Sequence, residues 1–388
     1  MVSNRNRLLT IPLVQFVLLF LYAFNDYHTS IQAGFGAGLN RMSVYVLLLL
    51  IIGVQSLYLF FHFDGRITSS NKVNPILVLL LIWVFFVNLY NKRPIWILSV
   101  HLFLNSWWLF TYSFNSVYVS KNRDCFKQYL IYYILLYGIY YLINIRARSN
   151  IIALTERDIA ITGYSYYAVV FLPFMFLIKK NWIKIVLIFS SIVLIISSFK
   201  RGPIIILPIM LLTYYYVNYK MGRASFSSFI RLLFVFLVCF GLFFWVNSIT
   251  EGALMDRFSA EQLEQGSGRS DMWRMALQDI SDRDNLTLLI GKGSGASFEL
   301  LQTGAHNEWI EFLYSFGLIG VLLYAILCVR FWGVIRYAIR MKYMYAAELS
   351  MMIVFCFISG LFSGFYFQYT SFYFFSFLGI VQGINTNR

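Results

Sequence analysis

Three short polar motifs interrupt a chain whose other long segments are mostly apolar. They are SSFKRGP at 197–203, GSGRSDMWRMALQDI at 266–280 and GAHNEWIEF at 304–312. The first two contain arginine, whose planar guanidinium can bind a phosphate group through two parallel hydrogen bonds. The third contains a histidine, and an imidazole with an ordinary pKa near 6.5 suits a general base. Together the motifs offer anion binding and proton transfer.

The first motif places Lys200 and Arg201 between two apolar runs. The distribution of basic residues along the chain puts this turn on the outer face of a membrane, where basic residues are disfavoured in short loops. One interpretation is a pair of side chains that extend to water from a turn closed by Gly202 and Pro203. The other is an anion site, and beside a membrane the expected anion is a lipid-linked phosphate. Arg201 is therefore a candidate catalytic residue and Lys200 a candidate substrate-binding residue.

The second motif is expected to form an amphipathic helix that starts near Ser270. Its apolar residues recur at helical spacing, at Met272, Trp273, Ala276, Leu277 and Ile280. Arg269 lies just before the first turn, where a helix N-terminus attracts anions, and Arg274 lies on the polar side. Such arginines can simply be solvated. The functional alternative makes Arg269 catalytic and Arg274 substrate-binding.

The third motif places His306 in front of Asn307, Glu308 and Glu311 at the start of an apolar run. A histidine at the end of a membrane span is commonly an interfacial residue with its hydrogen bonds satisfied. Here it adjoins a glycine-rich loop and carboxylates that could orient its ring, which favours a general base. We therefore take His306 as a catalytic candidate, with Asn307 and Glu311 as candidate substrate-binding residues.

Several other signals are weak. GKGSG at 291–295 lacks the spacing of a phosphate-binding P-loop. Asp282 and Asp284 form a DxD pair, but their position after the amphipathic helix favours a solvated helix end over a metal site. The four cysteines show neither a disulfide framework nor a CxxC metal motif. Nothing in the sequence suggests a nucleotide or metal cofactor, so none is expected.

Composition predicts an all-α polytopic membrane protein. Hydrophobic residues make up 60% of the 388 residues and charged residues only 12%, about half the charge of a soluble domain. Runs of 17 or more apolar residues recur, and inside lipid such runs must be helical because their backbone polar groups need internal partners. About twelve transmembrane helices are expected, at roughly 8–24, 42–63, 75–91, 94–112, 128–145, 160–178, 182–198, 203–219, 229–248, 307–328, 343–360 and 365–384.

Lys and Arg in the short loops predict the orientation. With both termini in the cytoplasm, most basic loop segments are cytoplasmic and the long polar loop at 249–306 is periplasmic. Residues 1–388 then form a single integral membrane domain that contains this loop. The formal net charge of +14 reflects topology and attraction to lipid headgroups, so no nucleic-acid partner is expected.

From about residue 150 to 330 the chain resembles the O-antigen ligase and polymerase superfamily of bacterial polysaccharide assembly. The resemblance consists of three motifs. They are the SFKRG turn at 198–202, the GRxxxW motif that begins at Gly268 and continues into the loop helix, and GKGSGASF at 291–298 followed by the His306–Asn307 pair. The twelve-span plan, with a large loop between the ninth and tenth spans, agrees with this family as well.

The resemblance implies a metal-independent glycosyltransferase of the bacterial inner membrane, with its active site facing the periplasm. Its donor and acceptor would be undecaprenyl-diphosphate-linked oligosaccharides, surrounded by membrane lipids, and a chain-length regulator protein is a further candidate partner. Arg201, Arg269 and His306 correspond to the family's two arginines and essential histidine, and Lys200 fits loosely the basic residue before the first arginine.

Three functions remain open at this point. A polymerase joins two lipid-linked glycans, whereas a ligase passes the finished glycan to lipid A–core. We favour the polymerase, because the composition rich in Phe and Tyr is typical of such enzymes, and the Arg257–Gly268 match to their R-x10-G pattern adds little. A flippase for lipid-linked oligosaccharides is the alternative from another class. Glu348 is the only charge well inside a predicted span, which disfavours transport.

Overall fold

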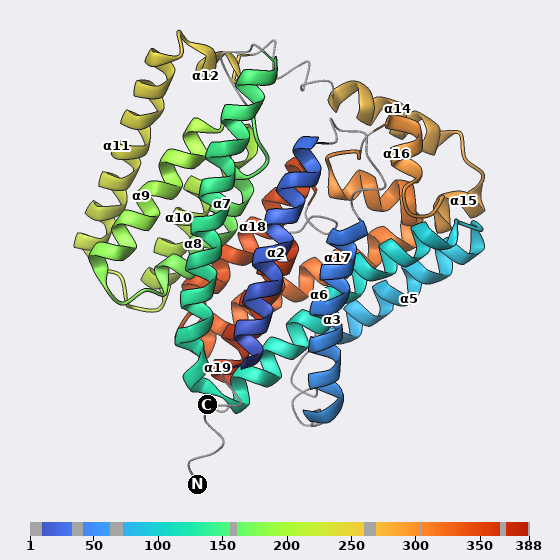
Figure 1. The fold of residues 1–388 in the computed structure, drawn as a ribbon, viewed down its shortest axis with the longest axis horizontal. Helices are drawn as coiled ribbons and strands as arrows, with labels where there is room; N and C mark the ends of the chain where they lie inside the picture. The colour runs from blue at the N-terminus through green and yellow to red at the C-terminus, as the bar shows by residue number, and fades with distance from the viewer. Residues whose placement is uncertain are drawn as a thin grey trace.

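The computed structural model describes residues 10–32, 42–62, 73–155, 161–259, 269–302, 304–364 and 370–386. These residues form an all-helical bundle, and no strand occurs among them (Figure 1). Residues 266–268, the glycine-rich start of the second motif, lie outside the described ranges.

Every predicted span contains a helix, as expected for apolar runs that must satisfy their own backbone. The helices are α2 (Thr10–Gln32), α3 (Met42–His62), α5 (Asn74–Tyr90), α6 (Ile95–Lys121), α7 (Phe126–Thr155), α8 (Ser165–Phe176), α9 (Asn181–Ser197), α10 (Arg201–Lys220), α11 (Phe226–Ile249), α17 (Glu308–Arg340), α18 (Ala346–Phe362) and α19 (Thr370–Asn385). The short elements are η1 (Arg123–Cys125), α12 (Ala253–Asp256), α14 (Arg269–Ser281), α15 (Asn285–Ile290) and α16 (Ala296–Leu301).

Among the described residues, four helices are long and apolar enough to cross a membrane. They are Arg123–Ile152, α10, α11 and α17, and the other apolar helices are shorter. The chain is therefore a membrane protein, while the twelve-span count and the periplasmic loop stay predictions. Five helices differ clearly in length from expectation: α2, α6, α7 and α17 continue well past the predicted ends of their spans, and α8 is shorter. A turn at residues 163–164 precedes α8 and shortens it, whereas α17 continues to Arg340 with exposed arginines that can extend to water.

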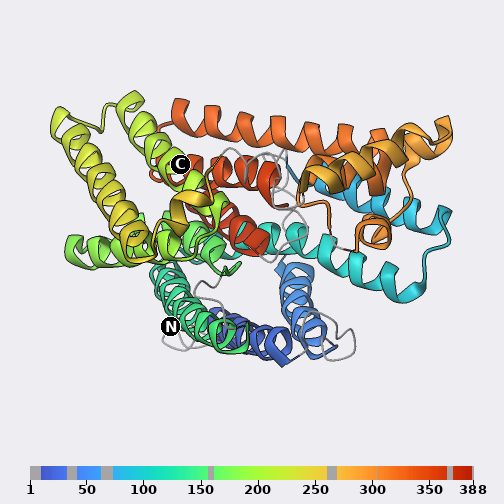
Figure 2. The same cartoon turned by 90° about the horizontal axis from the view of Figure 1, so that it is seen from above.

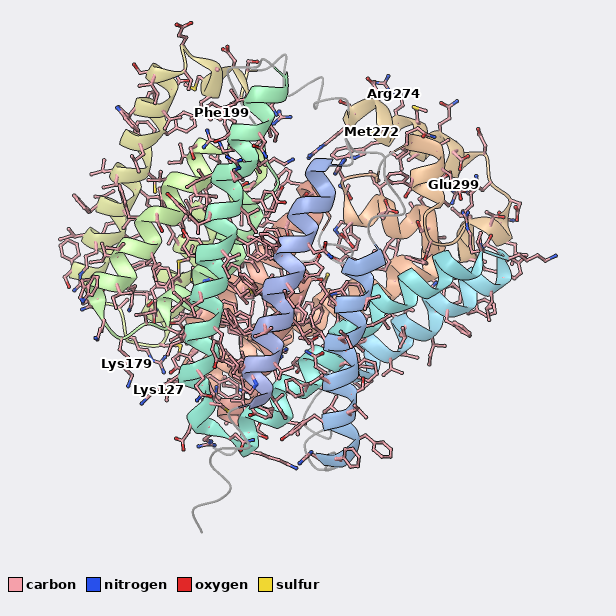
Figure 3. The ribbon with its side chains drawn as sticks, viewed as in Figure 1. Lys127, Lys179, Phe199, Met272, Arg274 and Glu299 are labelled. Carbon is pink, nitrogen blue, oxygen red and sulfur yellow. The ribbon has the colours of Figure 1, made fainter. Side chains whose placement is uncertain are left out.

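The C-terminal helices α18 and α19 lie in the middle of the bundle. α19 packs along α6, and α18 packs against α10 and α17. Helices α2, α3 and α7 form a group on one side, with α17 along the opposite edge (Figure 2). Lys127 and Lys179 lie at the opposite end of the molecule from Phe199 and Met272 (Figure 3). The first two motifs therefore lie at the same end of the bundle.

The glycine-rich loop 291–295 is tied to the end of α5. Asn88 and Ser294 exchange two hydrogen bonds of 2.9 Å each, and Arg93 Nε donates to the carbonyl oxygen of Lys292 at 3.0 Å. A Cβ on Gly291 would lie 2.5 Å from the Ser315 carbonyl oxygen, so only glycine allows this close approach to α17. The loop is thus a packing element that joins the short helices of the long polar loop at 249–306 to the bundle.

A second attachment lies between α14 and α17. Asp279 binds Lys292 at 2.7 Å and Arg283 at 2.9 Å. The Arg283 guanidinium lies 4.0 Å from the Tyr314 ring centroid and is almost fully buried. Asp284 caps α15 by accepting from the backbone N–H groups of Leu286 and Thr287. Asp282 and Asp284 are both exposed after α14, as expected for a solvated helix end, and the cap on α15 is a further role of Asp284 alone.

Candidate functional site

The turn between α9 and α10 presents the first two basic residues. Phe199 has a left-handed backbone with φ 54° and is buried, and Lys200 is the extended residue directly before Arg201, which starts α10. A Cβ on Gly202 would lie 2.1 Å from the Tyr166 hydroxyl oxygen. A side chain here would force the Tyr166 ring to move, and the absence of one lets α8 pack directly against the basic turn.

Four cations from three segments act on one another across this end of the bundle. Burial, together with repulsion from Arg269, Arg257 and Arg201, lowers the pKa of Lys200 to about 8. Burial also lowers the pKa of Arg257 and of Arg269, and each is repelled by Arg201. Mutual repulsion of this kind requires that the side chains converge. Lys200, Arg201, Arg257 and Arg269 form the cationic cluster.

Arg257 is the member of the cationic cluster that sequence reasoning did not select. It directly follows α12, whose start is fixed by Asn247 Oδ1 accepting from the Met255 N–H at 2.8 Å. Its buried Nε has no hydrogen-bond partner in the described part of the chain. The R-x10-G match that begins at Arg257 was the available signal, and its glycine, Gly268, lies outside the described ranges.

The carboxyl end of α18 binds three of the predicted site residues. Asn307 Nδ2 donates to the Leu361 carbonyl oxygen at 3.2 Å, and Arg269 Nη1 donates to the Phe362 carbonyl oxygen. The His306 ring forms a hydrogen bond with the main chain of Ser363. The last carbonyls of an α-helix lack partners within the helix and carry partial negative charge. They therefore suit these cationic and N–H donors.

The environment of His306 keeps its imidazole neutral. Burial, and next repulsion from Arg269 and Lys200, lower its pKa to about 4 against the opposing effect of the main-chain bond at Ser363. Because that bond raises the pKa, the ring donates to the Ser363 carbonyl oxygen through one nitrogen. At neutral pH the other nitrogen is then unprotonated and able to accept a proton. The backbone of His306 is left-handed, with φ 52°.

Asn307 and Glu311 make contacts within the protein. The Asn307 side chain accepts from the N–H groups of Trp309 and Ile310 and so caps α17. Glu311 accepts from the Ala305 N–H at 3.1 Å and from the Ser315 hydroxyl at 3.2 Å. Their predicted contacts with substrate stay predictions.

Arg274 lies apart from the cationic cluster. Its side chain is 78% exposed and pairs with Asp271 at 3.6 Å within the same helix, and it points to the outside of the molecule in Figure 3. The buried residues of α14 are Ala276 and Ile280, whereas Leu277 is 47% exposed. The amphipathic helix thus forms as expected, and its start brings Arg269, but not Arg274, to the cluster.

Residues 185–325 match the family model described as O-antigen ligase. This segment runs from α9 into α17 and contains the whole cationic cluster as well as His306. The chain carries a domain of the O-antigen ligase and polymerase superfamily. No curated protein matches the chain.

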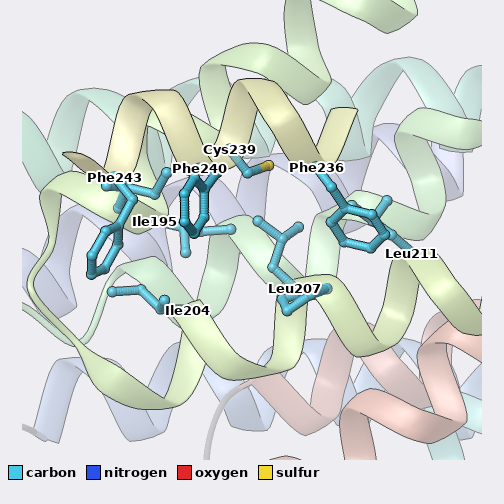
Figure 4. A pocket seen from close by; sticks show the side chains of 10 residues that line it. Ile195, Ile204, Leu207, Leu211, Phe236, Cys239, Phe240 and Phe243 are labelled. Carbon is cyan, nitrogen blue, oxygen red and sulfur yellow. The ribbon is translucent and has the colours of Figure 1, made fainter. Parts of the chain in front are cut away.

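An apolar groove begins beside the cationic cluster of this O-antigen ligase domain. It has a volume of about 240 Å³ and lies between α9, α10 and α11 (Figure 4). Its lining includes Ile195, Ile204, Leu207, Leu211, Phe240 and Phe243. Ile204 is one helical turn beyond Arg201, and the Phe243 ring packs 6.0 Å from that of Phe258, next to Arg257. The groove therefore extends from between two members of the cluster along α10.

The shifted pKa of Lys200 predicts pH-dependent anion binding. Below about pH 8 the amine is protonated, and it loses its charge as the pH rises through this value. We expect the affinity of the purified protein for inorganic pyrophosphate, measured by titration calorimetry, to fall about tenfold above this pH, the contribution of one charged hydrogen bond. Lys200→Arg should remove the decline, because a guanidinium keeps its charge.

Arg274→Ala is the matched control for this titration. Its cation lies outside the cluster, so both affinity and pH dependence should match the parent protein. Affinity that stays constant or rises between pH 7 and pH 9 in the parent would contradict a role for Lys200.

Proposed function

We propose that the chain is a membrane glycosyltransferase that polymerises lipid-linked repeat units. It would transfer an undecaprenyl-diphosphate-linked glycan to the non-reducing-end sugar hydroxyl of another lipid-linked unit. The observation that carries this proposal is the convergence of four cations with a neutral histidine inside the O-antigen ligase domain. The family match supports a ligase- or polymerase-type function in the membrane.

The cationic cluster suits the leaving group. Transfer breaks the bond between the anomeric carbon and the phosphate oxygen, so undecaprenyl diphosphate departs with added negative charge. Arg201, Arg257 and Arg269 present guanidinium groups that can share this charge through charge-assisted hydrogen bonds. Donors that are already oriented stabilise the transition state more than the ground state, because the charge develops as the bond breaks.

His306 suits the acceptor. The acceptor oxygen forms the new bond to the anomeric carbon, and its proton passes to the unprotonated nitrogen of the imidazole. The resulting imidazolium lies near a departing diphosphate, which stabilises it, and the proton then returns to water. Burial and the neighbouring cations lower the pKa of the imidazole, so the ring is neutral before the reaction and can accept the proton.

The apolar groove suits the lipid tail. A diphosphate at the cationic cluster would place the first isoprene units at Ile204, at the start of the groove. The stretch from Ile204 to Leu211 is about 10 Å long at the usual rise per residue. Such a tail would remain in contact with the membrane while its headgroup is bound.

The acceptor distinguishes polymerase from ligase, since both use the same donor. Arg257 would belong to the donor site and so does not separate the two reactions; the polymerase is favoured by the composition rich in Phe and Tyr. Deleting the gene and separating lipopolysaccharide by gel electrophoresis tests this directly. We expect the ladder to vanish while core carrying a single repeat remains. Loss of every repeat from the core would instead indicate a ligase.

Removing the proposed base should lower the rate of glycan transfer. In a purified system, His306→Ala and His306→Gln should each reduce kcat by roughly 10² to 10⁴, since glutamine cannot accept the proton. A glutamine variant with near wild-type kcat would assign His306 to structure alone.

The pH profiles of the parent enzyme provide a second test of the base. Protonation inactivates a general base, so on the acidic side kcat/KM should not fall until the pH approaches the His306 pKa of about 4. The bound diphosphate should raise this pKa, so kcat should begin to fall at a higher pH than kcat/KM. If kcat and kcat/KM begin to fall at the same pH, the diphosphate does not bind next to the imidazole.

Blocking the groove should weaken binding of the lipid tail. Ile204→Trp should raise KM for an undecaprenyl-linked donor about tenfold, since it displaces roughly two buried methylene groups of the ligand. A donor analogue with a single isoprene unit should be affected less. Leu212→Trp, on the exposed side of α10, is the control and should leave KM unchanged for both donors. An equal rise in KM for both donors in Ile204→Trp would show that the lipid tail does not bind in this groove.

A further inference from the structure

The peptide unit of Ala305, directly before His306, is held from both sides. Its N–H donates to Glu311 Oε2 at 3.1 Å, and its carbonyl oxygen accepts from Trp273 Nε1 at 2.7 Å. Ala305 itself is fully buried. The two partners come from different helices, α17 and α14. The main chain before the histidine is thus fixed relative to both helices.

This attachment explains how His306 keeps an unfavourable backbone conformation. A φ of 52° is rare for a residue with a side chain and costs on the order of 1–3 kcal/mol. Such a conformation persists only where the surroundings enforce it. The Ala305 contacts act on one side of His306, and the Asn307 cap of α17 acts on the other. The direction of the imidazole therefore depends on bonds that the ring itself does not make.

Glu311 is well placed for this task. Besides the Ala305 N–H, its carboxylate accepts from the Ser297 hydroxyl at 2.5 Å and the Ser315 hydroxyl at 3.2 Å. Ser297 belongs to α16, so Glu311 joins α16, α17 and the His306 segment. These three hydrogen bonds hold the carboxylate in one orientation.

Trp273 connects the same peptide to the cationic cluster. It lies one helical turn after Arg269 on α14. The Arg269 guanidinium and the Trp273 indole therefore move together as parts of one helix. Through the bond from Trp273 to Ala305, the position of His306 is set relative to Arg269.

We propose that Trp273 and Glu311 form a peptide clamp on Ala305 and act as positioning residues for His306. The clamp holds the ring against the carboxyl end of α18 and beside Arg269. The group that accepts the hydroxyl proton and the group that binds the diphosphate then keep a fixed position relative to each other. This inference rests on the proposed function for its kinetic readout. It differs from a substrate-binding role for Glu311, because the carboxylate acts through the main chain.

Two conservative variants test the clamp. Trp273→Phe removes the N–H donor but keeps an aromatic ring, and Glu311→Gln keeps the shape but loses one acceptor. Each should lower kcat about 10- to 100-fold, as expected for a small misplacement of a catalytic group, while KM for the donor changes less than about twofold. Trp309→Phe is the matched control, because it removes an indole N–H near the site that does not bind Ala305, and its kcat should be unchanged.

A readout independent of glycan transfer keeps the two proposals separable. Diethyl pyrocarbonate modifies neutral imidazole, so the rate at which His306 is modified as a function of pH, followed by peptide mass spectrometry, reports its pKa. We expect a value near 4 in the parent protein and a shift towards 6.5 in both clamp variants, because a loosened ring gains access to water. This shift can be measured even if the protein transfers no glycan.

Each alternative outcome overturns the clamp in its own way. A raised KM with unchanged kcat in Glu311→Gln would make Glu311 a substrate contact. Unchanged kcat and an unchanged His306 pKa in both variants would remove the clamp altogether. A lower melting temperature with an unaltered pKa would assign the contacts to stability alone. A shifted pKa in a protein that lacks transferase activity would retain the clamp and refute the proposed function.

Discussion

The site depends on the carboxyl end of α18, where three successive residues hold Asn307, Arg269 and His306 through main-chain hydrogen bonds. Carbonyl groups at a helix end offer partial negative charge without a full anion. A carboxylate in the same place would neutralise the arginines and compete with a phosphate ligand. Main-chain acceptors orient the donors and leave their positive charge available. They also cannot be lost by a point substitution, although their position depends on how α18 packs.

The packing of α18 explains why the central helices matter to the site. Ser363, the residue that follows α18, binds the Tyr166 side chain, and Tyr166 in turn lies under Gly202. The same short connection thus fixes the end of α18 relative to the basic turn at Lys200 and Arg201. Helices α8, α10 and α18 meet at this point, and α12, α14 and α17 bring the remaining residues.

Mutual repulsion within the cluster has a chemical consequence. Burial and repulsion at the cluster lower the pKa of Lys200 and of the neighbouring His306. A bound diphosphate reverses the sign of the local field and raises both pKa values. The imidazole would therefore become a stronger base at the moment when the donor is in place. Proton acceptance and departure of the leaving group would then be coupled by electrostatics.

Sequence alone predicted the helices well, because long apolar runs in a membrane have one way to satisfy their backbone. It also selected Arg201, Arg269 and His306, which stand out beside turns and helix starts. It did not select Arg257, because a loop arginine that faces water and one that faces a site look alike in sequence. The bond between Asn88 and Ser294 joins residues 206 positions apart, and no local pattern signals such a contact. The same holds for Trp273 and Ala305, whose bond gives Glu311 and Trp273 their proposed positioning role.

A structure of the protein with undecaprenyl diphosphate bound, determined by electron cryomicroscopy, tests the central claim most directly. The account predicts phosphate oxygens within about 3.2 Å of guanidinium nitrogens of Arg201, Arg257 and Arg269, with the lipid tail along the groove between α9, α10 and α11. A diphosphate bound away from these three arginines, or a tail leaving on the other side of α10, would contradict it.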